Sequence, residues 1–164
     1  MERIVKENCY LDIAETVLER STCLRRQYGA IIVRNDEIVA TGYNGAPRGR
    51  KNCSDLGLCV REQMCVPRGE RYELCRSVHA EANAIISASR NECIGGTIYL
   101  VGEDAKTGAI LSDATSCSMC RRLIINAGLE RVVIRMTPSE YTVVQVQDWI
   151  DQDDSIAEIE LDGV

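Results

Sequence analysis

Apolar positions in the first quarter of the chain follow helical spacing and then strand spacing. Residues 9–20 repeat apolar side chains three and four positions apart, which predicts an amphipathic helix with Asn8 as its N-cap. The runs 30–34 and 37–41 are rich in isoleucine and valine and predict two strands. The Asn-Asp pair at 35–36 favours a tight turn, so we expect a β-hairpin.

In the second half of the chain, apolar residues alternate between helical spacing and strand spacing. Residues 79–90 predict a helix, and the apolar run 97–101 predicts a strand. Residues 117–127 predict a further helix that ends at a glycine, and 131–136 predict the next strand. A strand, a helix and a strand in this order form a β-α-β unit, so the fold class we expect is α/β.

Four stretches are less regular. Residues 43–76 are rich in Gly, Pro, Arg and Cys, and a loop of this length is expected to be functional or held by something. Residues 102–116 predict a second loop, with a small hairpin turning at 106–108. Residues 142–150 suit either a strand or a helix, and 156–161 suit a short strand.

Composition fits one folded domain. The 164 residues are 45% hydrophobic and 27% charged, which excludes a disordered chain and predicts a single domain over 1–164. No apolar run reaches the roughly 18–20 residues of a membrane helix, and residues 1–6 lack the apolar core of a signal peptide, so we expect a cytoplasmic protein. The net charge is −6, and residues 148–164 hold seven acids and no Lys or Arg. This balance argues against a nucleic-acid polymer as partner.

The cysteines and the single histidine point to metal chemistry. Nine cysteines form an odd set with no secretion signal, which favours metal binding over a disulfide framework. His79 stands at a predicted helix start, and Cys117 and Cys120 form a C-x-x-C at another. One imidazole and two thiolates leave the fourth position of a tetrahedral zinc open, as in catalytic sites. Glu81 completes an H-x-E. Each part is common in structural roles, but together they predict a catalytic Zn²⁺ site.

These motifs carry a family resemblance. With G-Y-N-G-A-P at 42–47 and H-A-E-A-N-A-I at 79–85, the chain resembles the zinc-dependent cytidine/deoxycytidylate deaminases over about residues 8–136. The resemblance implies a three-layer α/β/α fold around a mixed sheet of about five strands. It also implies Zn²⁺ held by His79, Cys117 and Cys120. Zinc-bound hydroxide would attack C4 of the cytosine of dCMP, and Glu81 would shuttle protons to yield dUMP and ammonia.

The same resemblance assigns substrate contacts. Asn44 would hydrogen-bond the sugar, with Gly42 and Gly45 allowing its turn to approach the ligand closely. Arg25 and Arg26 are candidates for the 5′-phosphate, where the alternative is a solvated basic face. Ala80 would contact the substrate beside Glu81.

A second, structural zinc is also implied. Cys23, Cys53 and Cys75 match the places that supply its ligands in some relatives, and Cys59 or Cys65 would complete a four-cysteine site. The alternative is a set of unliganded thiols in a reducing compartment.

The sequence departs from the family in three places. Ser116 replaces the usual proline before C-x-x-C, where we expect it to cap the following helix. The loop 102–116 is longer than the family's connection, and the acidic extension 137–164 has no clear counterpart. Substrate choice therefore stays open between dCMP and another cytosine nucleotide, namely dCTP, CMP or a modified dCMP.

Two further readings compete with a small-nucleotide deaminase. Deamination of a polynucleotide is opposed by the acidic charge and by an aromatic set of six Tyr, one Trp and no Phe. A non-catalytic nucleotide-sensing module would be expected to lack Glu81. The resemblance also implies a homo-oligomer, expected to be a hexamer, with dCTP and dTTP as effectors.

Overall fold

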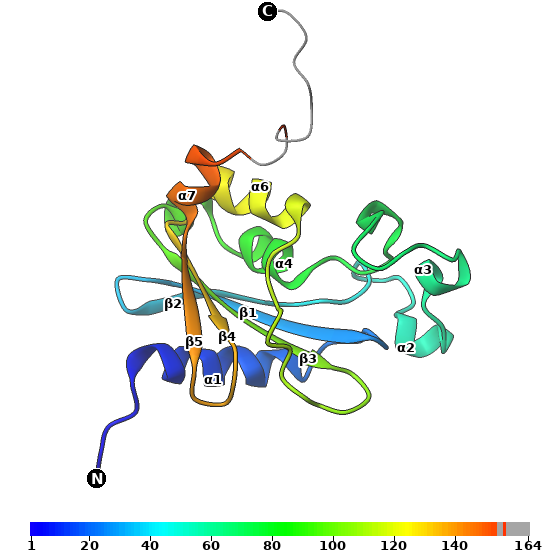
Figure 1. The fold of residues 1–164 in the computed structure, drawn as a ribbon, viewed down its shortest axis with the longest axis horizontal. Helices are drawn as coiled ribbons and strands as arrows, with labels where there is room; N and C mark the ends of the chain where they lie inside the picture. The colour runs from blue at the N-terminus through cyan, green and yellow to red at the C-terminus, as the bar shows by residue number, and fades with distance from the viewer. Residues whose placement is uncertain (154–155, 157–164) are drawn as a thin grey trace, which may run out of the picture.

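Five strands form one mixed sheet in the order β2-β1-β3-β4-β5 (Figure 1). The computed structural model describes residues 1–153 and 156. Only β3 and β4 run parallel, and the other neighbours are antiparallel. The strands are β1 (Arg26–Arg34), β2 (Glu37–Tyr43), β3 (Thr97–Asp104), β4 (Arg131–Arg135) and β5 (Tyr141–Gln145). The expected mixed sheet is confirmed.

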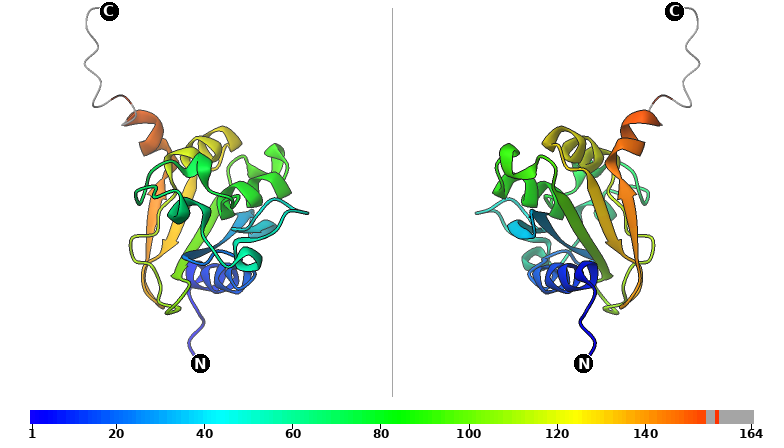
Figure 2. Two further views of the ribbon diagram at one scale, coloured as in Figure 1. Left: turned by 90° about the vertical axis from the view of Figure 1, so that its right-hand side faces the viewer. Right: turned by 90° about the vertical axis from the view of Figure 1, so that its left-hand side faces the viewer.

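Helices cover both faces of this sheet, as the two views of Figure 2 show. The helix α1 lies on one face, and α4 and α6 lie on the other, which confirms the three-layer α/β/α arrangement. The longer helices are α1 (Lys6–Leu18), α4 (Ala80–Ser87), α6 (Ser118–Ala127) and α7 (Val146–Asp151). The short ones are α2 (Cys53–Leu56), α3 (Val60–Gln63), the 3₁₀ turn η1 (Tyr72–Leu74) and α5 (Arg90–Cys93).

The alternation of side chains along β1 builds two separate cores. Ala30 and Ile32 belong to the core beneath α4 and α6, whereas Ile31 and Val33 belong to the core against α1. Successive residues of a strand point to opposite faces, so a strand buried on both faces needs apolar residues throughout. This explains why the strand runs read as continuous apolar segments.

The predicted β-hairpin is confirmed, and its turn has a clear cause. Asn35 and Asp36 have φ of 50° and 60°, so both are left-handed, as a two-residue hairpin turn of type I′ requires. Asn and Asp tolerate this conformation better than other residues with a Cβ.

Two predicted helix boundaries are wrong. The first helix begins at Lys6 with Val5 as its N-cap, and the Asn8 side chain instead donates to the Ser139 carbonyl over 3.1 Å. The helix expected over 79–90 is two helices, because Ser89 accepts from the backbone N–H of Glu92 and forms a capping box that starts α5.

The irregular stretches hold more structure than their patterns indicate. The segment 43–76 contains α2, α3 and η1, and an isolated bridge between Glu103 and Ile110 confirms the small hairpin in the second loop. Residues 142–150 hold both predicted states, because β5 runs directly into α7. The sheet therefore continues past residue 136. The strand expected at 156–161 lies outside the described residues apart from 156.

No helix in the described part is long and apolar enough to cross a membrane.

Candidate active site

The side chains of His79, Cys117 and Cys120 meet at the start of two neighbouring helices. His79 is the N-cap of α4, Cys117 is the N-cap of α6, and Cys120 follows in the first turn. The Nδ1 atom of His79 lies 3.4 Å from Sγ of Cys117 and 3.5 Å from Sγ of Cys120. Zinc bonds of ordinary length at a tetrahedral angle place a nitrogen and a sulfur ligand about 3.6 Å apart. The donor set therefore fits Zn²⁺. It is the one group of three such ligands that the described residues bring within 4.8 Å of one another.

The three ligands are electrically coupled. A hydrogen bond from Cys120 and the neighbouring His79 lower the pKa of Cys117 to about 4 against the opposing effect of burial, while the shared proton raises the pKa of Cys120. Hydrogen bonds to Cys117 and Cys75 raise the pKa of His79 to about 10. A thiolate is thus already favoured here, and a divalent cation would take the place of the remaining protons.

Glu81 lies in the first turn of α4 with only 5% of its surface exposed. Burial raises the pKa of its carboxyl, against smaller opposing effects from a backbone hydrogen bond and from His79. The protonated form is favoured at a higher pH than for an exposed glutamate, which suits a group that accepts and returns a proton.

Gly42 has a different role from the one expected. A Cβ on Gly42 would lie 2.3 Å from the carbonyl oxygen of Ala80 and 2.4 Å from the backbone nitrogen of Ala84. The missing side chain therefore lets β2 pack directly against the start of α4, rather than bringing the turn to a ligand. Asn83, to which the sequence assigned no role, donates to the Tyr43 carbonyl over 2.8 Å and ties the turn to the same helix.

Asn44 is buried and bonded to the backbone beside the site. Its Oδ1 accepts from the backbone N–H of Tyr28 over 2.8 Å and from the hydroxyl of Ser21, and its Nδ2 donates to the Arg26 carbonyl over 2.9 Å. The described hydrogen bonds use one of the two hydrogens on Nδ2. Ala80, the other predicted contact beside Glu81, is fully buried against Gly42.

Ser116 does not cap α6. The N-cap is Cys117, and no side chain caps this helix end. Ser116 is buried instead, and its hydroxyl lies close enough to Glu81 to lower the pKa of that carboxyl.

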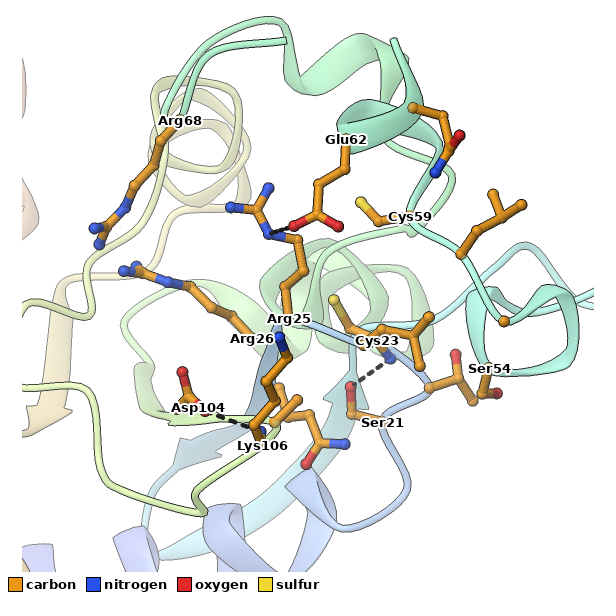
Figure 3. A pocket seen from close by; sticks show the side chains of 17 residues that line it. Ser21, Cys23, Arg25, Arg26, Ser54, Cys59, Glu62, Arg68, Asp104 and Lys106 are labelled. Carbon is orange, nitrogen blue, oxygen red and sulfur yellow. Dashed lines mark hydrogen bonds and ion pairs between the residues drawn. The ribbon is translucent and has the colours of Figure 1, made fainter. Parts of the chain in front are cut away.

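A small cavity lies over the ligand group, and a larger one adjoins it. The smaller, of about 120 Å³, is lined by His79, Glu81 and Cys117, and also by Arg25 and Arg26. The larger, of about 790 Å³, shares these two arginines (Figure 3). The structure thus brings both predicted phosphate contacts to the site.

Aromatic and cationic side chains that the sequence analysis missed complete the wall. The ring of Tyr72 meets the His79 ring edge-on at 5.3 Å, and the guanidinium of Arg61 lies 4.5 Å above Tyr72. Arg61 and Arg68 also line the smaller cavity. These residues lie in the segment 43–76, whose lack of periodicity gave no signal for them.

The cysteines predicted to hold a second zinc lie near one another. Burial, and then the charges of Cys23, Cys75 and Cys59, raise the pKa of Cys53. The donor atoms of His79, Cys117 and Cys120 lie within 4.8 Å of one another, and no three of the four cysteines Cys23, Cys53, Cys59 and Cys75 come that close among the described residues. Cys65, the alternative fourth ligand, is exposed. The second metal site stays a prediction.

Comparison with known proteins agrees with this geometry. Residues 5–136 match the family model for the cytidine and deoxycytidylate deaminase zinc-binding region. This chain belongs to that family. The family's zinc-binding character agrees with the donor set described above, so the cofactor is Zn²⁺.

Named relatives narrow the comparison. The deoxycytidylate deaminase of Mycobacterium phage D29 is 36% identical over 138 residues, which cover 81% of this chain and 96% of the phage protein. That of Schizosaccharomyces pombe is 32% identical over 127 residues, which cover 77% of this chain but 36% of the yeast protein. The crystal structure of dCMP deaminase from cyanophage S-TIM5 in apo form superposes with a TM-score of 0.55 at 26% identity, over 79% of this chain and 81% of that one.

Proposed function

We propose that this protein is a zinc-dependent hydrolase that converts dCMP and water into dUMP and ammonia. One observation carries the proposal: a buried carboxyl, Glu81, lines the same small cavity as His79 and Cys117, which form one donor group with Cys120. The relatives named above are deoxycytidylate deaminases, and the phage D29 protein matches over nearly its whole length. Both findings support this substrate.

The proton chemistry belongs to Glu81. Zinc held by the three ligands supplies a water of lowered pKa that can attack carbon at neutral pH. Glu81 would accept the proton of the attacking water and deliver it to N3 of the cytosine ring. It would then take the proton of the new hydroxyl on C4 and deliver it to the amino group, which leaves C4 as ammonia. Burial of its carboxyl raises its pKa, which favours a residue that holds each proton between acceptance and delivery.

The remaining predicted contacts would select the nucleotide. Arg25 and Arg26 line the cavity and would face the 5′-phosphate. Asn44 keeps one amide hydrogen for the sugar beyond its described bonds, and Ala80 would contact the base from the start of α4. A related cytosine nucleotide, dCTP, CMP or a modified dCMP, would use the same contacts and is the second candidate substrate.

Several expectations accompany the proposal. We treat 1–164 as a single domain, with its core at about 8–136 and an acidic extension at 137–164. We also retain a second zinc at Cys23, Cys53, Cys75 and Cys59, which metal analysis would test as two zinc ions per chain.

Assembly and location are proposed on similar grounds. Leu123 on α6 and Ile86 on α4 are 45% and 73% exposed, which suits a homo-oligomer, expected as a hexamer with dCTP and dTTP as effectors. Light scattering with and without each nucleotide tests both points. None of the nine cysteines forms a disulfide, which suits the cytoplasm.

The test is ultraviolet-monitored deamination by zinc-loaded protein. The panel is dCMP, dCTP, CMP and deoxycytidine, with Glu81→Ala as control. We expect turnover of dCMP above the others, abolished in the variant. Faster turnover of another nucleotide in the panel would support the same deamination reaction with a different substrate. If none turns over, the protein is not a cytosine nucleotide deaminase, and a sensing module becomes the better explanation.

A further inference from the structure

An ion pair joins two separate segments at the mouth of the small cavity. Arg68 Nη2 lies 3.0 Å from Oδ2 of Asp113, and Arg26 Nη2 lies 3.7 Å from the same oxygen. Gly69, next to Arg68, and Thr115, two residues after Asp113, both line the cavity. The pair therefore links two segments that line the cavity, with Asp113 itself outside the lining.

The charges around this entrance are unequal. Four arginines line the cavity, and Glu81 is the one acid among the described residues that do so. Two of these arginines have partners of their own. Arg25 Nε lies 2.9 Å from Glu62 (Figure 3), and Arg61 donates to the Pro67 carbonyl over 3.1 Å.

The other two arginines converge. Arg26 and Arg68 extend toward the same side of the site (Figure 3), and both approach one carboxylate oxygen of Asp113. Two guanidinium groups around one anionic oxygen form an arrangement that phosphate oxygens also fit. Asp113 thus supplies from within the chain the anion that these arginines bind.

Exposure indicates that this contact can open. The cavity of about 120 Å³ adjoins the larger one of about 790 Å³, and Arg26 and Arg68 line both. The side chains of Arg68 and Asp113 are 63% and 62% exposed, so their pair is weak and is readily exchanged for another anion.

We propose that Asp113 competes with the 5′-phosphate of the substrate for Arg26 and Arg68, and so biases binding toward ligands that carry a phosphate. A nucleoside monophosphate replaces the carboxylate with a dianion. A nucleoside without phosphate leaves the Asp113 pair in place and gains nothing from the two arginines. The inference rests on the proposed function only for the class of ligand, a pyrimidine nucleoside monophosphate.

Calorimetric binding tests this directly. Zinc-loaded Glu81→Gln protein would be titrated with dCMP and with deoxycytidine, alone and combined with Asp113→Asn or Arg68→Gln. We expect Asp113→Asn to lower the Kd of dCMP by about two- to fivefold, because it removes a weak competing ion pair. Arg68→Gln should raise the Kd of dCMP by about tenfold or more, as expected for loss of a charge-assisted bond. The same variant should leave deoxycytidine binding unchanged or tighter.

Matched controls separate this role from a general effect of charge. Arg71→Gln removes an arginine of the same segment that pairs with Glu73 and does not line the cavity. Asp36→Asn removes an exposed carboxylate that pairs with Lys6 in the hairpin turn. Neither change should alter the ratio of the two dissociation constants.

The inference and the proposed function fail in different ways. If Asp113→Asn does not tighten dCMP binding, or if Arg68→Gln weakens both ligands equally, the competition is refuted even where wild-type protein deaminates dCMP. If the binding shifts occur but wild-type protein does not deaminate dCMP, the competition stands and the proposed reaction is wrong. Absence of dCMP binding overturns both.

Discussion

The close approach of β2 and α4 at Gly42 should control the chemistry at His79 and Glu81. A Cβ at this position would lie 2.3 Å and 2.4 Å from two backbone atoms of α4, where 3.4–4 Å is ordinary contact. Gly42→Ala must therefore move the start of the helix by about 1 Å, because close-packed backbone cannot absorb the overlap. The metal ligand and the proton carrier both lie on the displaced turn.

The expected losses can be scaled. Overpacking of this kind costs about 1–3 kcal/mol of unfolding free energy. A displacement of about 1 Å at a catalytic group lowers the rate by about a hundredfold. We expect kcat/KM for dCMP deamination to fall by about that factor, with weaker zinc retention on dialysis. Ultraviolet kinetics, metal analysis and thermal unfolding measure the three effects.

Gly45→Ala is the matched control, in the same turn. Its Cβ would meet the Thr22 hydroxyl at 3.1 Å, a side-chain atom that can rotate away. We expect the control to keep its zinc and most of its activity. If Gly42→Ala folds, keeps its zinc and retains kcat/KM within about threefold of wild type, the packing does not position the catalytic turn and the reasoning is wrong.

Three further predictions concern the metal, the buried carboxyl and the buried ion pair. His79→Ala should lose zinc and deaminase activity together, and wild type treated with a chelator should regain both on adding Zn²⁺, as atomic absorption and ultraviolet kinetics would show. Burial raises the pKa of Glu81 in the folded protein above its value in the unfolded chain. The protonated carboxyl therefore favours the folded state fully at pH values below the pKa of the unfolded chain. This stability is lost as the pH rises through the pKa of the folded protein. Metal-free Glu81→Gln should therefore gain melting temperature over metal-free wild type as the pH rises from about 5 to about 8, and a constant difference would contradict this. Arg135 is 2% exposed and lies 2.7 Å from Asp12 and 2.6 Å from Glu15, so replacing both carboxylates by alanine should cost more unfolding free energy than Arg135→Met, with losses up to about 3 kcal/mol in urea denaturation.

The central strands β1, β3 and β4 were predictable from the sequence because they are mostly buried. The runs 30–33 and 98–101 are apolar throughout, and each falls within an observed strand. Helix boundaries were less predictable, since they depend on tertiary contacts. Asn8 has the chemistry of an N-cap, yet its side chain bonds to the Ser139 carbonyl far along the chain.

The residues of the candidate site also differ in how far the sequence predicted them. His79 and Glu81 belong to one local motif, so their spacing alone predicted a shared role. Arg68, Tyr72 and Asp113 have no such signal, because only the folded chain brings their loops to the cavity. Motifs thus identified the residues proposed to react, whereas the residues proposed to select the ligand required the structure.

The distribution of protons at this site follows from environment rather than residue type. The starts of α4 and α6 lie on the same face of the sheet, and helix N-termini favour negative charge (Figure 2). Three acidic groups lie in this positive field, yet they titrate differently. Hydrogen bonding lowers the pKa of Cys117 to about 4, whereas burial raises the pKa of Glu81. A thiol is ordinarily the weaker acid by several units, so the site inverts the normal order. This order favours a cysteine thiolate as a ligand for a cation, and the raised pKa of Glu81 suits a carboxylate that accepts a proton and returns it.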